Sequence, residues 1–151
     1  MKRIGNLFHE VVSFSNFLKA SKKAIKRKKK LENVSHYFFN MEKEILSLKE
    51  EIESGQYKPR PYKQFIIKEP KVRLICCSDF RDRVVHHAVC IVLDPIFEKK
   101  LISDSFACRR GKGTHRGVKR CQEFSQRYKY FLKCDIRKYF ESIDHKLLKN
   151  L

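Results

Sequence analysis

Residues 131–145 read FLKCDIRKYFESIDH, and this stretch decides how the rest of the sequence is interpreted. It places one acid, Asp135, directly after a short and mostly apolar run that predicts a strand over residues 130–135. A carboxylate at the end of a buried strand costs free energy unless it is paired or holds a cation. The pattern therefore favours a metal-dependent site, while a helix cap or a salt-bridged strand end stays open as an alternative.

The composition points to a polyanionic partner. The chain has 151 residues, enough for one domain with a core, and its 35 Lys and Arg against 17 Asp and Glu give a formal net charge of +18. A charge of this size predicts binding to nucleic acid or to an anionic membrane surface. Twelve Phe and six Tyr suit stacking on bases, although most aromatic side chains belong to a core.

Two segments carry nearly all of the excess charge. Residues 1–30 contain ten basic residues and a single acid, and residues 99–120 contain eight basic residues and a single acid. The run from Lys22 to Lys30 fits a nuclear signal, a membrane patch, a nucleic-acid arm or an ordinary solvated helix face. The sequence leaves these four interpretations open.

The cysteines and the N-terminus indicate a cytoplasmic protein. Six cysteines occur without C-x-x-C spacing and without a histidine cluster that would complete a zinc site. We interpret them as buried thiols in a reducing compartment. No signal peptide and no stretch of membrane-spanning length is apparent.

Apolar spacing predicts two N-terminal helices. The first covers residues 4–28 and ends in the basic run, and the second covers residues 34–53. Ser54-Gly55 is expected to stop the second helix. Both apolar stripes are assigned to packing.

A hairpin and a buried helix are predicted next. Two β-rich runs, residues 65–67 and 73–75, flank a Pro-containing turn and predict a hairpin with a basic tip. Asp79 is expected to cap a helix that reaches Phe97 and is apolar nearly all round, so that it should be buried.

The remaining elements follow a basic loop. Thr114 is expected to cap a helix through Arg127, and Asp144 is expected to cap a last helix whose apolar face includes Leu151. The loop at residues 111–115 lacks the spacing of a nucleotide-binding phosphate loop. Its basic side chains are expected to contact nucleic-acid phosphates: Arg109, Arg110, Lys112 and Arg116.

Three segments resemble reverse transcriptases in their order and spacing. They are KVRLICCSDFRDRVVHHAV at 71–89, LDPIFEKKLISDSFACRRGKGTH at 93–115, and FLKCDIRKYFESIDH at 131–145. The wider pattern is similar to the group II intron and retron-type enzymes. The details DRVVHHAV, SFACRRGKGTH and DIRKYFESIDH most resemble the reverse transcriptases of diversity-generating retroelements.

The resemblance implies an α+β fold that forms the N-terminal part of a right-hand polymerase. Residues 1–56 would be a basic helical N-terminal extension, residues 57–129 the fingers region, and residues 130–151 the start of the palm. The implied activity is RNA-directed DNA polymerisation, which copies template RNA into cDNA.

The resemblance also implies the roles of particular residues. Asp135 would be the first catalytic aspartate and would bind Mg²⁺ together with the backbone carbonyl of Ile136. Phe140 would be the gate that excludes the ribose 2′-hydroxyl, or else a core residue. The basic hairpin side chains would hold the incoming dNTP, or else be solvated charges: Lys68, Lys71 and Arg73.

The chain departs from the family pattern in one respect. The family needs a second carboxylate pair, and no Asp-Asp dipeptide occurs in this sequence. We therefore expect that the chain alone does not polymerise DNA. A truncated reading frame, a gene fragment and half of a split enzyme are the three alternatives that the sequence leaves open. The implied partners are template RNA, a DNA or RNA primer, dNTPs, and in a diversity-generating element a small basic accessory protein.

Two other function classes compete with a polymerase. A non-catalytic RNA- or DNA-binding module accounts for the charge and predicts affinity that falls steeply with salt. A membrane-surface protein would use the apolar face of the first helix, including Phe8, Phe14 and Phe17, although nothing further along the chain needs a membrane.

Overall fold

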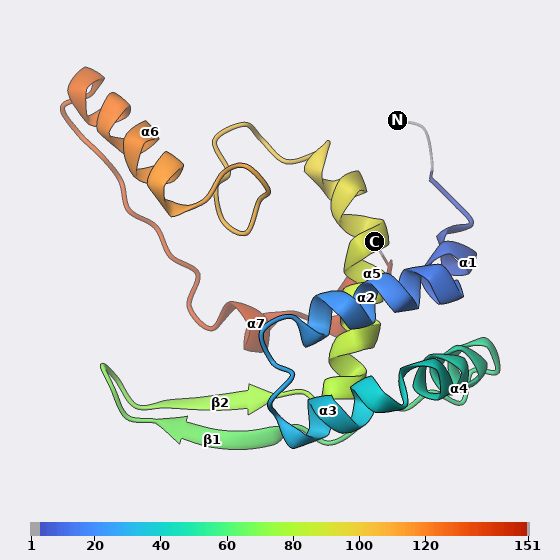
Figure 1. Cartoon of the computed structure of the whole chain (residues 1–151). Coiled ribbons are helices and arrows are strands. Elements are labelled where there is room, and N and C mark those ends of the chain that lie inside the picture. Colours follow the sequence, from blue (N-terminus) through green and yellow to red (C-terminus); the bar gives the residue numbers. More distant parts are fainter. Residues whose placement is uncertain (1–3, 151) are drawn as a thin grey trace. The chain divides into compact units, whose positions relative to one another are not determined.

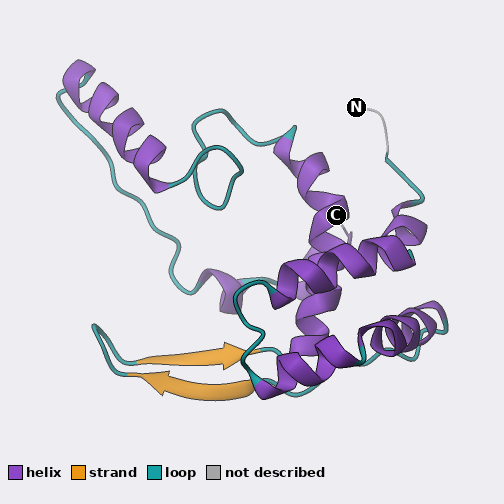
Figure 2. Cartoon of the chain, in the orientation of Figure 1, coloured by secondary structure: helices purple, strands orange, loops and turns teal. Residues whose placement is uncertain are grey.

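The structure is a computed structural model that describes residues 4–150, except for the side chain of Glu141. Helices and one two-stranded antiparallel sheet make up the described part, which is consistent with the α+β class (Figure 2). The chain divides into two compact units, the first ending at Leu101 and the second beginning at Ile102 (Figure 1). Residues 1–3 of the predicted extension and Leu151 of the predicted last helix lie outside the described residues.

The first predicted helix is two helices. Helix α1 spans Leu7–Val12 and helix α2 spans Phe14–Ile25. Ser13 lies between them in an extended conformation, and its side chain accepts a hydrogen bond from the Asn16 backbone N–H at 3.3 Å. Because a serine in this conformation caps a new helix, the chain turns where apolar spacing predicted continuity.

The second predicted helix is also interrupted. Helix α3 spans Glu32–Phe39 and helix α4 spans Met41–Glu53, with Asn40 between them outside helical geometry. The predicted stop is confirmed, since Ser54 ends α4 and Gly55 follows with φ of +71°. Glycine adopts this left-handed conformation without steric cost.

The core of the first unit forms where α2 crosses helix α5, which spans Phe80–Glu98 (Figure 1). Helices α1, α3 and α4 pack around this crossing. The fully buried apolar side chains come from four helices: Phe17, Ala20, Val34, Ile45, Leu48, Val84 and Ala88. Asp79 caps α5 as predicted, because its Oδ1 accepts a hydrogen bond from the Arg81 N–H at 3.0 Å.

The prediction that α5 is buried along its length is wrong for its second half. Phe80, Val84 and Ala88 are buried, whereas Val89, Ile91 and the residues after them are half-buried or exposed. The first half of α5 contacts α3 through Phe80, α4 through Arg81 and α2 through Ala88, and an apolar sequence is buried only where another element packs on it.

Asn16 joins three segments of this core. Its Nδ2 donates hydrogen bonds of 3.0 Å to the Val11 carbonyl and 3.0 Å to the Ala88 carbonyl of α5. We expect Asn16→Ala to lower the free energy of unfolding by about 1–3 kcal/mol, because the Ala88 carbonyl stays buried and loses a donor. Urea denaturation checks this value. The exposed Asn33→Ala is the matched control, and an equal loss in both variants would contradict the assignment.

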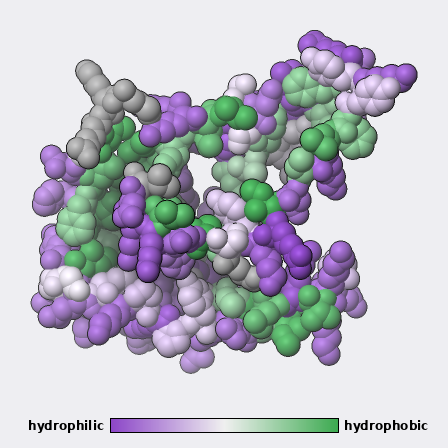
Figure 3. Space-filling view, turned by 180° about the vertical axis from the view of Figure 1, so that it is seen from behind, coloured by the Kyte–Doolittle hydropathy of each residue, from purple (hydrophilic) through white to green (hydrophobic). Residues whose placement is uncertain are grey.

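The predicted hairpin is confirmed. Strand β1 (Lys63–Ile67) pairs antiparallel with strand β2 (Arg73–Cys77), from Lys63 opposite Cys77 to Ile67 opposite Arg73. Both faces carry apolar side chains that are exposed, with Ile66 62% accessible on one face and Phe65 50% accessible on the other. Figure 3 shows the resulting hydrophobic patch over the hairpin, beside hydrophilic surface.

The second unit contains three helices in its described part: α6 (Thr114–Arg127), α7 (Tyr139–Ser142) and α8 (His145–Asn150). The prediction that Thr114 caps α6 is wrong. Gly113 is the N-cap, with φ of +103°, and Thr114 is the first helical residue. The predicted cap of the last helix is confirmed, because Asp144 Oδ1 accepts from the Lys146 N–H at 2.7 Å.

The predicted strand at residues 130–135 is not formed. Within residues 4–150 the ladder pairs β1 only with β2, so the backbone of 130–135 has no neighbouring strand to bond. Phe131 and Leu132 are 93% and 87% exposed. The expectation that Asp135 ends a buried strand is therefore wrong, and Asp135 lies in an exposed extended segment.

Candidate functional site

The basic residues at the hairpin tip are exposed and extend into solvent. Lys68 and Lys71 lie on the turn between the strands, and Arg73 is the first paired residue of β2. None of the three side chains forms a hydrogen bond or ion pair with a residue in the described part of the chain. These cations are free to meet a phosphate, whose oxygens suit Lys and Arg.

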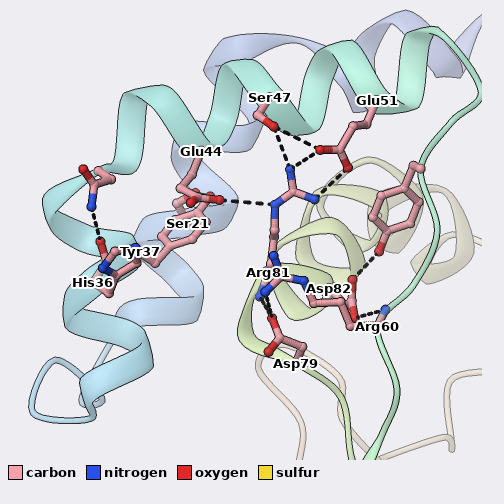
Figure 4. Close-up of polar contacts among 12 residues, drawn as sticks. Ser21, His36, Tyr37, Glu44, Ser47, Glu51, Arg60, Asp79, Arg81 and Asp82 are labelled. Atoms are coloured by element: carbon pink, nitrogen blue, oxygen red, sulfur yellow. Dashed lines mark hydrogen bonds and ion pairs between the residues drawn. The ribbon is translucent and has the colours of Figure 1, made fainter.

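A network of polar contacts fixes the base of the hairpin (Figure 4). The Asp82 side chain is 2% exposed and accepts hydrogen bonds from the Tyr57 hydroxyl at 2.7 Å and the Arg60 N–H at 2.9 Å. Arg60 also forms an ion pair with Asp79 at 3.2 Å. The segment that enters β1 is thereby bonded to the segment that follows β2.

Arg81 connects the same region to α4. Its two terminal nitrogens donate to the Glu51 carboxylate at 2.7 Å each, and its Nε donates to Glu44 at 3.2 Å (Figure 4). Ser47 accepts a further bond at 3.0 Å. This bidentate geometry is strong and directional. The start of α5 is therefore held in a fixed position on α4.

The electrostatics of this network follow from its hydrogen bonds. The bond from Arg81 lowers the pKa of Glu51, and the same bond raises the pKa of Arg81. Burial, together with the hydrogen bond to Asp82, raises the pKa of the Tyr57 hydroxyl. Tyr57 therefore remains a neutral hydroxyl that donates its proton to the hydrogen bond with Asp82.

The sequence analysis did not predict this network. The available signal was a pair of opposite charges, Arg81 and Asp82, in the first turn of a helix that is mostly apolar further along. Charged side chains at a buried position need partners. The identity of the partners depends on how α4 and residues 57–60 pack, which the local sequence does not contain.

The lowered pKa of Glu51 predicts acid sensitivity. Its carboxylate stabilises the fold at pH values above its unfolded pKa, and this stabilisation is lost as pH falls through the lower folded pKa. We expect the urea concentration at the unfolding midpoint to decrease once the pH is below about 4, and to decrease less in Glu51→Gln than in the parent chain. Urea titrations from about pH 7 to about pH 3 check this, with the exposed Glu50→Gln as control. Equal acid sensitivity of Glu51→Gln and the parent would contradict it.

The four basic residues predicted to contact nucleic acid divide into two pairs. Arg109 donates to the carbonyls of Ile102 and Ser105 at 2.6 and 3.0 Å, and Lys112 donates to the Ser103 carbonyl. This pair holds the loop before α6 in shape. Arg110 and Arg116 are exposed, and their side chains make no hydrogen bond or ion pair within residues 4–150.

The segment around Asp135 presents its functional candidates to solvent. Asp135 is exposed and makes no hydrogen bond or ion pair within the described residues. Ile136 is exposed as well, and the Phe140 ring is 84% exposed, with its centroid 5.2 Å from that of Tyr139. Neither a helix cap nor a salt bridge accounts for Asp135, and Phe140 is not a core residue.

The fit of this segment to a metal ion is limited to one ligand group. No cluster of three or more His, Cys, Asp or Glu side chains that could hold a metal occurs among residues 4–150. Asp135 supplies one exposed carboxylate, which suits a hard cation such as Mg²⁺ that takes further oxygens from substrate and water. The described residues therefore supply one carboxylate ligand for Mg²⁺ and not a complete magnesium site.

The known proteins similar to this chain include a group II intron-encoded protein and an intron maturase. Group II intron-encoded protein LtrA of Lactococcus lactis is 26% identical over 113 residues, 73% of this chain and 19% of that protein. Nuclear intron maturase 1, mitochondrial, of Arabidopsis thaliana is 31% identical over 83 residues, 53% of this chain and 12% of that protein. Protein YkfC of Escherichia coli is 27% identical over 114 residues, 70% of this chain and 29% of that protein. No protein-family model matches the chain.

The fold and the exposed charged groups define a basic α+β protein suited to nucleic acid. The comparisons make the chain similar to group II intron maturases and reverse transcriptases, and they confirm the wider resemblance to group II intron enzymes found in the sequence. The chain spans between 12% and 29% of the length of the relatives named above. No helix among the described residues is both long and apolar enough to cross a membrane.

Proposed function

We propose that the chain is the fingers region and first palm segment of an RNA-directed DNA polymerase, which copies template RNA into cDNA. The observation that carries this proposal is the exposed and unpaired Asp135, in a motif that resembles the first catalytic motif of the family. A carboxylate without a structural partner is available for chemistry. The relatives from group II introns support the same class of activity.

Each predicted residue has a role in this proposal. Asp135 and the Ile136 carbonyl would hold Mg²⁺, which when bound activates the primer 3′-hydroxyl and stabilises the leaving pyrophosphate. Lys68, Lys71 and Arg73 neutralise and orient the triphosphate of the incoming dNTP. Phe140 stands five residues after Asp135 and excludes the ribose 2′-hydroxyl by its bulk.

The domain assignment remains part of the proposal. We assign residues 1–56 to a basic N-terminal extension, 57–129 to the fingers and 130–151 to the start of the palm. All six cysteines are free thiols, but five are exposed and Cys77 is half-buried, so the expectation that they are buried is wrong. A reducing, cytoplasmic compartment stays an expectation from the sequence.

Primer extension tests the proposal. The chain is joined to a family palm and thumb, which supply the second aspartate pair, and is given an RNA template, a DNA primer, dNTPs and Mg²⁺. We expect extension by the joined polypeptide and none by the 151-residue chain alone, because a single carboxylate does not hold two metal ions in line. A folded joined polypeptide that binds template and primer without extending the primer would contradict the proposal.

The type of element is a finer proposal with two candidates. The motif details DRVVHHAV and DIRKYFESIDH favour a diversity-generating retroelement, with a small basic accessory protein as partner. The relatives favour an intron maturase. The neighbouring DNA separates the two: a variable repeat pair indicates the first, and flanking intron RNA sequence indicates the second.

A non-catalytic RNA- or DNA-binding module is the second candidate function, and the net charge of +18 favours it. It predicts that the affinity of the chain for RNA falls steeply as salt rises. Retained RNA affinity together with the absence of extension by the joined polypeptide would favour this function over a polymerase.

A further inference from the structure

Basic side chains from α2, from the turn after it and from α5 lie near enough to one another for their charges to act on the His87 ring. We name them the α2–α5 basic cluster, which consists of Lys23, Lys28, Arg83, His86 and His87. Ser21 and Ala24 of α2 and Val84 and Ala88 of α5 are buried at this crossing. Lys23 and His87 each stand next to one of these buried positions, so the two flank the packed helices.

Lys28 joins the cluster through an ordered turn. After α2 ends at Ile25, Arg27 has φ of +64° and the Lys28 N–H donates to the Ile25 carbonyl at 2.8 Å. The Lys28 carbonyl accepts from the Leu31 N–H at 3.1 Å. These bonds turn the chain, so that the basic run does not continue α2 away from α5.

The His87 ring is half-buried and lies within range of the charges of the other cluster residues. Burial lowers the pKa of His87 below its ordinary value, and the charges of Lys23, Lys28, His86 and Arg83 lower it further. These groups come from α2, from the turn after it and from α5 itself, and all are basic. Within the described residues neither lysine forms an ion pair, so the charge is not neutralised by the protein.

Arg83 adds an unsatisfied donor to the same cluster. Its guanidinium lies 5.3 Å from the centre of the Phe80 ring, and its buried Nε has no hydrogen-bond partner within residues 4–150. A buried donor without an acceptor is costly, and such groups are rare in folded proteins. An anion beside the cluster would offer the acceptor that the protein does not supply.

We propose that the α2–α5 basic cluster binds the phosphodiester backbone of RNA, as a site separate from the hairpin tip and from residues 109–116. The inference rests on the proposed nucleic-acid function and gives it a location. An extended polyanion suits this place because exposed basic residues continue along the turn from Lys26 to Lys30. A membrane surface suits it less, because Phe17 is fully buried, and the exposed Phe8 and Phe14 lie in α1 and at the start of α2, at the other end of α2 from the basic turn.

Binding at this site should take up a proton at His87. A phosphate beside the ring raises the pKa of the bound state above that of the free state. The gain in affinity is then fully present below the free-state pKa and is lost as pH rises through the bound-state pKa. RNA affinity should therefore increase as pH falls from about 8 to about 5.5, by up to about tenfold if the pKa rises by one unit.

The test uses the full 151-residue chain and a labelled single-stranded oligouridylate. Affinity is measured over a range of salt concentrations for the parent, Lys23→Gln and Lys28→Gln, with Lys43→Gln on α4 as the matched loss of one exposed charge. Each cluster variant should reduce the slope of log affinity against log salt by about 0.7, as expected for one lost phosphate contact on a single strand. The control should leave the slope unchanged.

The proton uptake is measured in two ways. His87→Gln should abolish the rise of RNA affinity at low pH, whereas His36→Gln on the exposed side of α3 should retain it. An NMR titration of the His87 ring in the parent chain, with and without the oligouridylate, should show a higher pKa in the complex. The NMR measurement needs no variant and so does not depend on the stability of His87→Gln.

The outcomes separate this inference from the proposed function. Salt-dependent RNA binding with unchanged slopes in both lysine variants and an unchanged His87 titration would overturn the cluster as a site and leave the nucleic-acid function standing. The absence of salt-dependent RNA binding would overturn both. Loss of binding to phosphatidylserine vesicles in the lysine variants, without loss of RNA binding, would assign the cluster to membranes and overturn the inference.

Discussion

Replacing Asp135 by alanine should abolish primer extension by the chain joined to a family palm and thumb. We expect a fall in rate of about 10³-fold or more, because the site loses a carboxylate that holds its largest local charge. This corresponds to at least about 4 kcal/mol of transition-state stabilisation. The side chain is exposed and makes no contact within the described residues, so its removal should leave folding unchanged. Single-turnover extension on an RNA template measures the effect.

Asp144→Ala is the matched control for this variant. Asp144 is an exposed carboxylate in the same segment, and it caps α8 through bonds to the N–H groups of Lys146 and Leu147. Its loss should cost about 1 kcal/mol of local helix stability and little activity. Both variants should bind template RNA like the parent. Full extension by Asp135→Ala would remove Asp135 from the catalytic role.

Replacing Asp82 by alanine should lower the free energy of unfolding by about 3–4 kcal/mol. The buried Asp82 carboxylate accepts from the Tyr57 hydroxyl and the Arg60 N–H, and both donors would lose their acceptor. For a chain of this size the melting temperature should fall by about 10 °C. Thermal and urea unfolding measure the loss.

Two further variants separate the causes of that loss. Tyr57→Phe removes one donor and keeps the acceptor, so about 1 kcal/mol should be lost. Asp94→Ala removes an exposed carboxylate from the same helix and should change stability little. If Asp82→Ala were as stable as Asp94→Ala, the network at the base of the hairpin would have no stabilising role.

Features set by neighbouring residues could be predicted from the sequence. The hairpin, the cap of α5 by Asp79 and the end of α4 at Ser54-Gly55 each depend on a few adjacent side chains. The breaks at Ser13 and Asn40 were missed because apolar spacing continues through them, while the local polar residue ends the helix.

Features set by distant partners could not be predicted from the sequence. The apolar run at residues 130–135 has strand composition, but a strand forms only beside another strand, and none pairs with it in the described part of the chain. The contacts of Arg81 with Glu44 and Glu51 depend on how α4 packs near the start of α5. The α2–α5 basic cluster likewise depends on tertiary packing that joins residues 23–28 to residues 83–87.

The proposed function assigns one dNTP contact to the hairpin tip and another to the Asp135 segment. A dNTP carrying a photoreactive group on its γ-phosphate, added with RNA template and DNA primer to the joined polypeptide, tests this most directly. The account predicts cross-links to the peptide containing Lys68, Lys71 and Arg73, and their loss when unlabelled dNTP is added. A second dNTP, with the photoreactive group on its sugar, should label the peptide containing Asp135 and Phe140. The absence of cross-links to either peptide, or cross-links that are insensitive to competing dNTP, would contradict the proposed dNTP contact of that peptide.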